Sequence, residues 1–145
     1  MNSGAITFFG KGRCAGCHNG KFFTDFKFHS IGTPQGEFGT HIQRQDIGRA
    51  GVTYELKDRY LFRTPPLIGV SHTAPYGHNG VFETLEEVIL FHINPIPFFM
   101  DKGWSSKKEL LTYGKLVSSR SEILGYIDVS SEFELSALEA FLQTL

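Results

Sequence analysis

The chain has 145 residues, of which 41% are hydrophobic and 20% are charged, and its formal net charge is −1. This length suits one ordinary domain, so we expect residues 1–145 to form a single domain. The composition argues against a disordered chain, and the near-zero charge argues against a protein that binds nucleic acid by neutralising phosphates. No apolar run approaches the roughly 20 residues that a membrane span needs.

The first predicted element is a short apolar helix around Ile6 to Phe9, which glycines at positions 10 and 12 bring to an end. The residues before it lack the basic start and the apolar stretch of a signal peptide. We therefore expect that this chain contains no signal peptide.

Directly after this helix come both cysteines of the chain, in the pattern Cys14-Ala-Gly-Cys17 followed by His18. Two cysteines cannot build a disulfide framework, and a zinc site would need two more ligands at suitable spacing. The pattern is that of c-type haem attachment, in which two thiols add to the porphyrin vinyl groups and the adjacent histidine lies against the iron. A thioredoxin-like dithiol is the alternative, but it needs a strand before the motif. We therefore expect one covalent haem c bound by Cys14, Cys17 and His18.

Residues 19–83 are rich in glycine, proline and other turn formers, and they lack helical periodicity. A loop-rich stretch of this length is typical of a chain that wraps around a ligand, and a haem would be that ligand. We expect two short elements within it, each a strand or a turn, near Phe26 to Ile31 and near Tyr54. The 14 phenylalanines would supply much of the lining of the haem pocket.

Three longer helices are predicted in the second half. The residues Thr84 to Glu87 have the form of a capping box that begins a helix, and Pro95 ends it. A second helix runs from about Ser106 to Val117, and the last begins with the capping box Ser131 to Glu134. The sequence therefore predicts a mainly α fold: a cytochrome c-like helical domain wrapped around one covalently bound haem, with long Gly/Pro-rich loops.

The second axial ligand of the iron has two candidates. His92 lies on the same helix face as Val88 and Ile89, so its imidazole would point into the core. A buried ring nitrogen needs a partner, which the iron would supply. Met100 follows a proline-rich aromatic segment and is the rival, with ordinary core packing as its other interpretation. The local sequence leaves both open.

Two further segments are Phe62-Arg-Thr-Pro-Pro-Leu67 and Thr73-Ala-Pro-Tyr-Gly-His-Asn-Gly80. With them, the sequence resembles the C-terminal haem domain of the bacterial di-haem cytochrome c peroxidase and MauG family, including related di-haem oxidoreductases. The resemblance covers nearly the whole chain, from Phe8–Cys14 through Asp46–Arg49 to the final helix.

The resemblance implies roles for particular residues. Cys14 and Cys17 match the thioether cysteines, and His18 matches the proximal ligand. His92 occupies the distal-ligand position of the family, which implies ligation of the iron by two histidines and a low-spin iron. His78 matches a histidine of the haem pocket, and we expect it to act as a catalytic residue that assists proton transfer.

Other expectations concern anions, cations and the remaining histidines. Thr73 and Pro75 match positions whose carbonyls help to bind calcium between two haem domains, so calcium is a further candidate cofactor, although this chain supplies only one side of that site. Arg49 and Arg63 would neutralise haem propionates, since a guanidinium suits a carboxylate; bracing a loop is the alternative. Surface or loop positions are expected for the other histidines: His29, His41 and His72.

Members of this family carry two haems on two domains, whereas this chain has one attachment motif, so we expect the peroxide-reacting domain to be missing from it. The leading hypothesis is the electron-transfer half of a cytochrome c peroxidase-type system in the bacterial periplasm. It would receive electrons from a small cytochrome or a cupredoxin and pass them to a second haem domain. The alternatives are a peroxidase that acts on hydrogen peroxide after losing the distal ligand, and a module that senses a gas or another small ligand.

Overall fold

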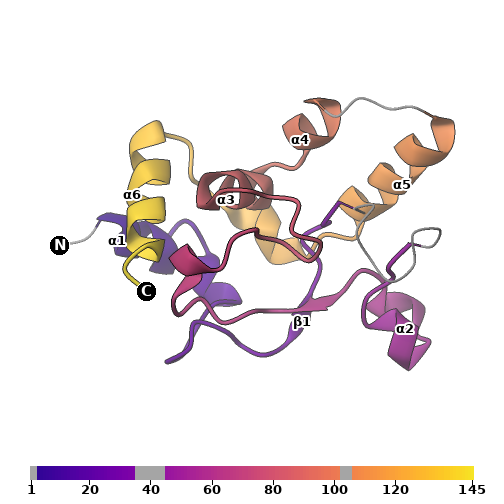
Figure 1. Ribbon diagram of the computed structural model, residues 1–145, viewed down its shortest axis with the longest axis horizontal. Helices are drawn as coiled ribbons and strands as arrows, with labels where there is room; N and C mark the ends of the chain where they lie inside the picture. Colours follow the sequence, from indigo (N-terminus) through magenta and orange to yellow (C-terminus); the bar gives the residue numbers. More distant parts are fainter. Residues whose placement is uncertain (1–2, 35–44, 102–105) are drawn as a thin grey trace.

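The structure is a computed structural model that describes residues 3–34, 45–101 and 106–145. In this part of the chain the fold is mainly helical, as predicted (Figure 1). The α-helices are α1 (Ser3–Phe9), α2 (Ala50–Thr53), α3 (Leu85–Ile93), α4 (Ile96–Asp101), α5 (Lys107–Ser118) and α6 (Glu132–Leu142). The 3-10 helices are η1 (Cys14–Gly16), η2 (Leu56–Asp58), η3 (Val70–His72) and η4 (Glu122–Tyr126). The antiparallel strands β1 (Phe28–His29) and β2 (Phe62–Arg63) pair Phe28 with Arg63 and His29 with Phe62.

Both predicted capping boxes are confirmed. At the start of α3, the Thr84 hydroxyl accepts the backbone N–H of Glu87 at 3.1 Å, and the Glu87 carboxylate accepts the N–H of Thr84 at 3.2 Å. The same reciprocal pair joins Ser131 and Glu134 at the start of α6. Each box satisfies two N–H groups that the first helical turn leaves without a partner, and this fixes where the helix begins.

Two elements differ from the sequence expectation. A further helix, α4, follows Pro95 directly, because the Asn94 side chain accepts the N–H of Ile96 at 3.1 Å and restarts the helix. Its Pro97 lies in the first turn, where a helix makes no use of the backbone N–H. The segment near Tyr54, expected as a strand or a turn, forms the short helices α2 and η2, and Tyr54 itself ends α2 with a φ of 61°.

One hydrophobic core forms where α1 packs against α6 and α6 meets α3 (Figure 1). Gly4 lies against the backbone of Ala137 so closely that any side chain at this position would overlap the Ala137 carbonyl. This close approach lets the two helices share a core, which we call the cavity-side cluster. Its buried members are Phe8, Val70, Leu85, Ile89, Leu138, Phe141 and Leu142.

A second core, which we call the aromatic cluster, includes residues from α3, α4 and α5. Its buried members are Tyr60, Phe82, Phe91, Phe99, Tyr113 and Leu116. The rings of Phe82 and Phe91 lie 4.9 Å apart, and those of Phe99 and Tyr113 lie 4.7 Å apart. Helix α3 therefore contributes to both cores. Among the described residues, no helix is long and apolar enough to cross a membrane.

Candidate cofactor site

The site is a cavity of about 440 Å³ that the cavity-side cluster leaves open. Its walls come from Phe8 of α1, the turn at η1, the segments 29–33 and 62–78, helices α3 and α6, and the residues of η4 and just after it. Most of the side chains from α3 and α6 that border it are aliphatic, for example Val88, Ile89 and Leu138. A cavity of this size lies within the range that binds cofactors in proteins.

The attachment motif forms a tight turn on one wall of this cavity. The backbone N–H groups of Cys17 and His18 both donate to the carbonyl of Cys14, at 3.2 and 2.8 Å. Both thiols are half-buried, and burial raises the pKa of Cys14 to about 11. A redox dithiol needs a thiol with a lowered pKa, so this environment argues against the thioredoxin-like alternative.

His18 is oriented by a hydrogen bond from its Nδ1 to the carbonyl of Phe23, at 3.1 Å. Because a carbonyl only accepts, Nδ1 carries the proton and Nε2 keeps its lone pair. Burial lowers the pKa of His18 and keeps the ring neutral. A metal-binding histidine uses one nitrogen for a bond to the protein and the other for the metal. Nδ1 of His18 makes the first kind of bond, and the backbone of Pro65 also interacts with the ring.

His92, in the last turn of α3, has the same arrangement. Its Nδ1 donates to the Val88 carbonyl one turn earlier, at 2.6 Å, so Nε2 keeps its lone pair, and no hydrogen bond joins it to another of the described residues. Burial, and to a lesser extent repulsion from Arg120 and from His18 when it is protonated, lowers the pKa of His92 to about 4. Both imidazoles line the same cavity. The structure therefore brings together two neutral histidines that are prepared in the same way for a metal.

Met100, the rival ligand, lies elsewhere. It belongs to α4, its side chain is 58% exposed, and it is not among the described residues that line the cavity. The geometry therefore favours His92 over Met100.

The two arginines that are predicted to bind haem propionates lie in different places. Arg63 lines the cavity. Arg49 does not; its Nε donates to Asp58 at 3.1 Å and its guanidinium lies over the ring of Phe28, 4.5 Å from the centroid. This placement corresponds to the loop-bracing alternative, since Asp58 lies in η2.

His78 lines the cavity, as do Thr73 and Pro75, the two calcium-matching positions. The His78 ring stacks on that of Phe62 with centroids 3.7 Å apart, and the His78 Nε2 lies 2.7 Å from a carboxylate oxygen of Asp46. Stacking and the hydrogen bond fix the imidazole at the rim.

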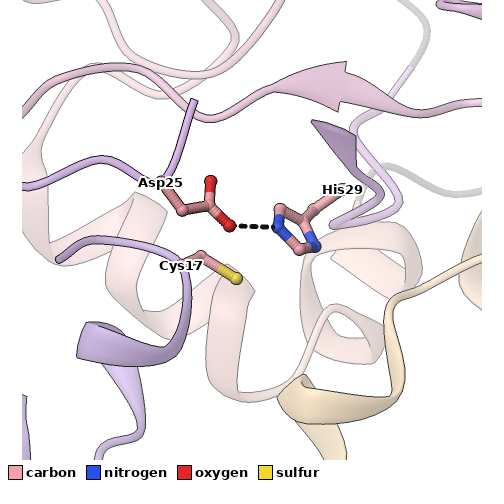
Figure 2. Close-up of side chains that lie close together, drawn as sticks. All are labelled: Cys17, Asp25 and His29. Atoms are coloured by element: carbon pink, nitrogen blue, oxygen red, sulfur yellow. Dashed lines mark hydrogen bonds and ion pairs between the residues drawn. The ribbon is translucent and has the colours of Figure 1, made fainter. Parts of the chain in front are cut away.

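His29 was expected on the surface or in a loop, and this expectation is wrong. It belongs to β1 and borders the cavity, while its Nε2 bonds the Asp25 carboxylate at 2.8 Å. Figure 2 shows this pair beside the Cys17 sulfur, and the three ligand atoms lie within 4.8 Å of one another. Such a trio has the chemistry of a zinc ligand set, but it includes one of the two attachment thiols. His72 is exposed, as expected, whereas His41 lies outside the described residues.

The expectation for the phenylalanines is also wrong in large part. Among those in the described ranges, only Phe8 and Phe62 border the cavity. The aromatic cluster, on the other side of α3, takes Phe82, Phe91 and Phe99. Leucines, isoleucines and valines line the cavity instead, including Ile123 and Leu124 of η4, which no sequence pattern pointed to.

Comparison with known proteins places this geometry in a family. The chain is 32% identical to the cytochrome-c peroxidase IdrP1 of Pseudomonas sp. (strain SCT), over 90% of this chain and 40% of that protein. It is 37% identical to the methylamine utilization protein MauG of Methylorubrum extorquens, over 62% of this chain and 24% of that protein. Among solved structures, a MauG-like protein associated with microbial copper homeostasis superposes with a TM-score of 0.72 and 27% identity, over 99% of this chain and 45% of that one. The chain belongs to the cytochrome-c peroxidase and MauG family.

The structure of the diheme peroxidase BthA from Burkholderia thailandensis shows the same fold, with a TM-score of 0.70 at 22% identity, over 99% of this chain and 41% of that one. No protein-family model matches the sequence. The chain spans about 40% of the length of its cytochrome-c peroxidase relative IdrP1. The matched region includes the cavity, which is therefore the part to interpret within the cytochrome-c peroxidase and MauG family.

Proposed function

We propose that this chain binds one haem c through Cys14 and Cys17, with His18 and His92 as axial ligands, and that it transfers single electrons. In this proposal it is the electron-transfer haem domain of a cytochrome c peroxidase-type system in the bacterial periplasm. Its partners are a small electron-donor protein, either a cytochrome or a cupredoxin, and a second haem domain.

One observation carries the proposal: two histidines line the same cavity, each with Nδ1 bonded to a backbone carbonyl, so that Nε2 of each keeps a lone pair for a metal. Ordinary core histidines use both nitrogens or keep one in water, because a buried unpaired nitrogen costs free energy. Here the attachment cysteines stand beside one of the two rings. A haem iron bound by both Nε2 atoms accounts for all four residues together.

When bound, the haem supplies an iron that changes between the ferric and ferrous states by one electron. The protein's own groups bind and orient it: the two thiols fix the porphyrin edge, and the aliphatic walls exclude water. Arg63 lies where a guanidinium could pair with a propionate. With both axial positions taken, the iron would be closed to small molecules, which favours electron transfer over direct reaction.

A second function is favoured by His78. Its imidazole borders the cavity and bonds the Asp46 carboxylate, an arrangement that can take and return a proton. If His92 left the iron, hydrogen peroxide would have access to it and His78 could assist proton transfer. This peroxidase would consume two electrons and two protons for each peroxide reduced to two molecules of water.

The test is the spin state of the haem-loaded chain. Optical and electron paramagnetic resonance spectra should show low-spin ferric iron, and His92→Ala should convert it to high-spin iron. Met100→Leu is the matched control and should leave the spectra unchanged. Cys14→Ser and Cys17→Ser should each remove one thioether bond in the pyridine haemochrome spectrum.

A high-spin wild-type chain would contradict ligation by two histidines. Conversion by Met100→Leu rather than by His92→Ala would move the ligand to Met100. Steady turnover of hydrogen peroxide by the wild type that His78→Gln abolishes would support the second function instead.

A further inference from the structure

Three phenylalanines stand exposed in the segment that runs from the attachment motif into β1. Their side chains are 45% (Phe22), 52% (Phe26) and 37% (Phe28) exposed. A cation lies over each ring: Lys21 over Phe22 at 4.7 Å, Arg63 over Phe26 at 5.8 Å and Arg49 over Phe28 at 4.5 Å. Each pair is a cation–π contact that holds a long side chain against a ring.

The three pairs are continuous with one another. The rings of Phe22 and Phe26 lie 6.5 Å apart, and Arg63 is the cross-strand partner of Phe28. Arg63 thus lies over the ring of Phe26 and is paired with Phe28 across the two strands. We call these six residues the aromatic–cationic surface: Lys21, Phe22, Phe26, Phe28, Arg49 and Arg63.

The surface is positively charged, although the whole chain carries a net charge of −1. Lys27 adds a further exposed cation within the same segment. Two acids that bond residues of this region are largely covered: the side chain of Asp25 is 8% exposed against His29, and that of Asp58 is 13% exposed against Arg49. Asp46, which bonds His78, keeps a side chain that is 52% exposed. The six residues of the surface themselves present cations and rings, and their charge differs in sign from that of the molecule.

The surface also adjoins the cofactor site. Arg63 belongs to both, since it lines the cavity. The backbone carbonyl of Phe22 accepts the N–H of Leu67, another cavity residue, at 3.2 Å. Asp25, between Phe22 and Phe26, donates its N–H to the carbonyl of Cys17 at 2.8 Å. A protein bound here would lie next to the attachment turn.

We propose that the aromatic–cationic surface binds an electron-transfer protein whose contact face is acidic. This inference rests on the proposed function. One electron leaves the redox centre of the partner, which is oxidised, and reduces ferric iron to ferrous iron; no bond is made or broken and no proton moves. Exposed rings supply a contact that excludes water, and the cations around them steer an acidic partner and set its orientation.

The charge pattern argues against two other occupants. A basic partner would meet like charges, which cost free energy at an interface. A second copy of this chain, related by a two-fold axis, would place this surface against itself and bring the same cations together. An acidic protein is the occupant that the cations favour.

The test measures binding to the haem-loaded chain rather than its activity. The isotope-labelled protein is titrated with cadmium-substituted plastocyanin, a redox-inert acidic cupredoxin, and with zinc-substituted mitochondrial cytochrome c, a basic protein. Amide shift changes should gather at residues 21–28, 49 and 63 for the acidic probe only. This binding should weaken steeply up to about 0.5 M salt, where charges are screened within a few ångström.

Matched variants give the decisive comparison. The double variant Lys21→Glu/Lys27→Glu should weaken binding of the acidic probe by about tenfold, which is about 1.4 kcal/mol. Lys107→Glu/Lys108→Glu, the same charge change on α5, should alter it by about twofold or less. Phe26→Ser, which removes a ring and no charge, should weaken binding without changing its salt dependence.

Equal effects of the two double variants, shift changes on another face, or preference for the basic probe would each overturn this inference. These outcomes differ from failure of the proposed function. In that case the wild-type chain would carry no covalent haem, or high-spin iron, before any partner is added.

Discussion

The two sides of α3 are built from different residues. The side that includes Leu85, Val88, Ile89 and His92 borders the cavity and is aliphatic apart from the imidazole. The other side places Phe91 in the aromatic cluster, where its ring lies 4.9 Å from Phe82. One helix thus separates an open apolar space from a core that is filled with rings.

The difference shows how a small protein can keep a large cavity. Aromatic rings in edge-to-face contact fill space densely and lose few rotamers, so they make a stiff support behind the helix. Flexible aliphatic walls on the other side adapt to a flat ligand. The aromatic residues therefore stabilise the helix that carries His92 rather than lining the site itself.

Phe91→Ala should have the largest effect on this arrangement. The side chain is 1% exposed, and its loss leaves a cavity at the centre of the aromatic cluster, which we expect to cost about 3–5 kcal/mol of the free energy of unfolding. Chemical denaturation of the haem-loaded chain measures it. Ile89→Ala is the comparison on the cavity side, and it should cost less because it removes a smaller side chain. Only Ile89→Ala should shift the haem absorption of the folded protein; the reverse would contradict the division of roles.

Replacing Arg120 should have the next largest effect, because this side chain holds the end of α3 that carries His92. Its Nη2 donates to the backbone carbonyl of His92 and to that of Phe91, and its Nε is buried without a hydrogen-bond partner among the described residues. A guanidinium in this position satisfies carbonyls that the helix leaves open and faces the negative end of the helix dipole. Arg120→Met should cost about 1.5–3 kcal/mol, toward the lower end since the side chain is only half-buried.

Spectroscopy distinguishes a positioning role for Arg120 from a purely structural one. Arg120→Met should speed cyanide binding to the ferric iron, because His92 would leave more readily. It should also lower the reduction potential, because a positive charge near the iron favours the ferrous state. Arg120→Lys should largely restore the potential, since it keeps the charge. Unchanged potential and cyanide kinetics in Arg120→Met would reduce this residue to a structural one.

A substitution at the opposite end of α3 should have a smaller effect on the free energy of unfolding. Thr84→Ala removes half of the capping box and should cost about 1 kcal/mol. Ser131→Ala makes the same change at the start of α6 and should cost about as much. Neither should alter the spin state of the iron, because His92 lies at the other end of its helix. A spin-state change in Thr84→Ala alone would show that the whole of α3 positions the ligand.

These contrasts also show what a sequence can predict. The capping boxes at Thr84 and Ser131 are local chemistry, so the starts of α3 and α6 could be stated closely. The pairing of His18 with His92 needed more than local sequence: helical spacing put His92 on an apolar face, but Met100 stayed open until the family resemblance favoured His92. For the capping boxes alone, neighbouring residues determine the outcome.

Features that depend on packing could not be predicted in this way. Hydrophobic pattern shows that Phe82, Phe91 and Phe99 are buried but not which of two cores they join. The wall at Ile123 and Leu124 belongs to a short 3-10 helix, which has no periodic pattern. The placement of Arg49 depended on Asp58, nine residues further along the chain, against which it folds.

The smallest effect concerns the contact that ties the attachment region to α6. Lys11 forms an ion pair with Glu134, and this pair, with the N–H groups of Ser130 and Ser131, lowers the pKa of Glu134 from 4.5 to about 2. A depressed pKa stabilises the folded state fully above the ordinary value and loses that contribution as the pH falls toward the folded value. The free energy of unfolding, measured between about pH 5 and pH 2, should therefore fall with falling pH, and Glu134→Gln should reduce this dependence.

Lys11→Met should reduce the pH dependence only in part, because the two backbone donors to Glu134 remain. An unchanged pH dependence in Glu134→Gln would assign the acid sensitivity to other carboxylates. Since α6 belongs only to the cavity side of α3, this acid effect should add to that of Phe91→Ala, which acts on the other side, without coupling.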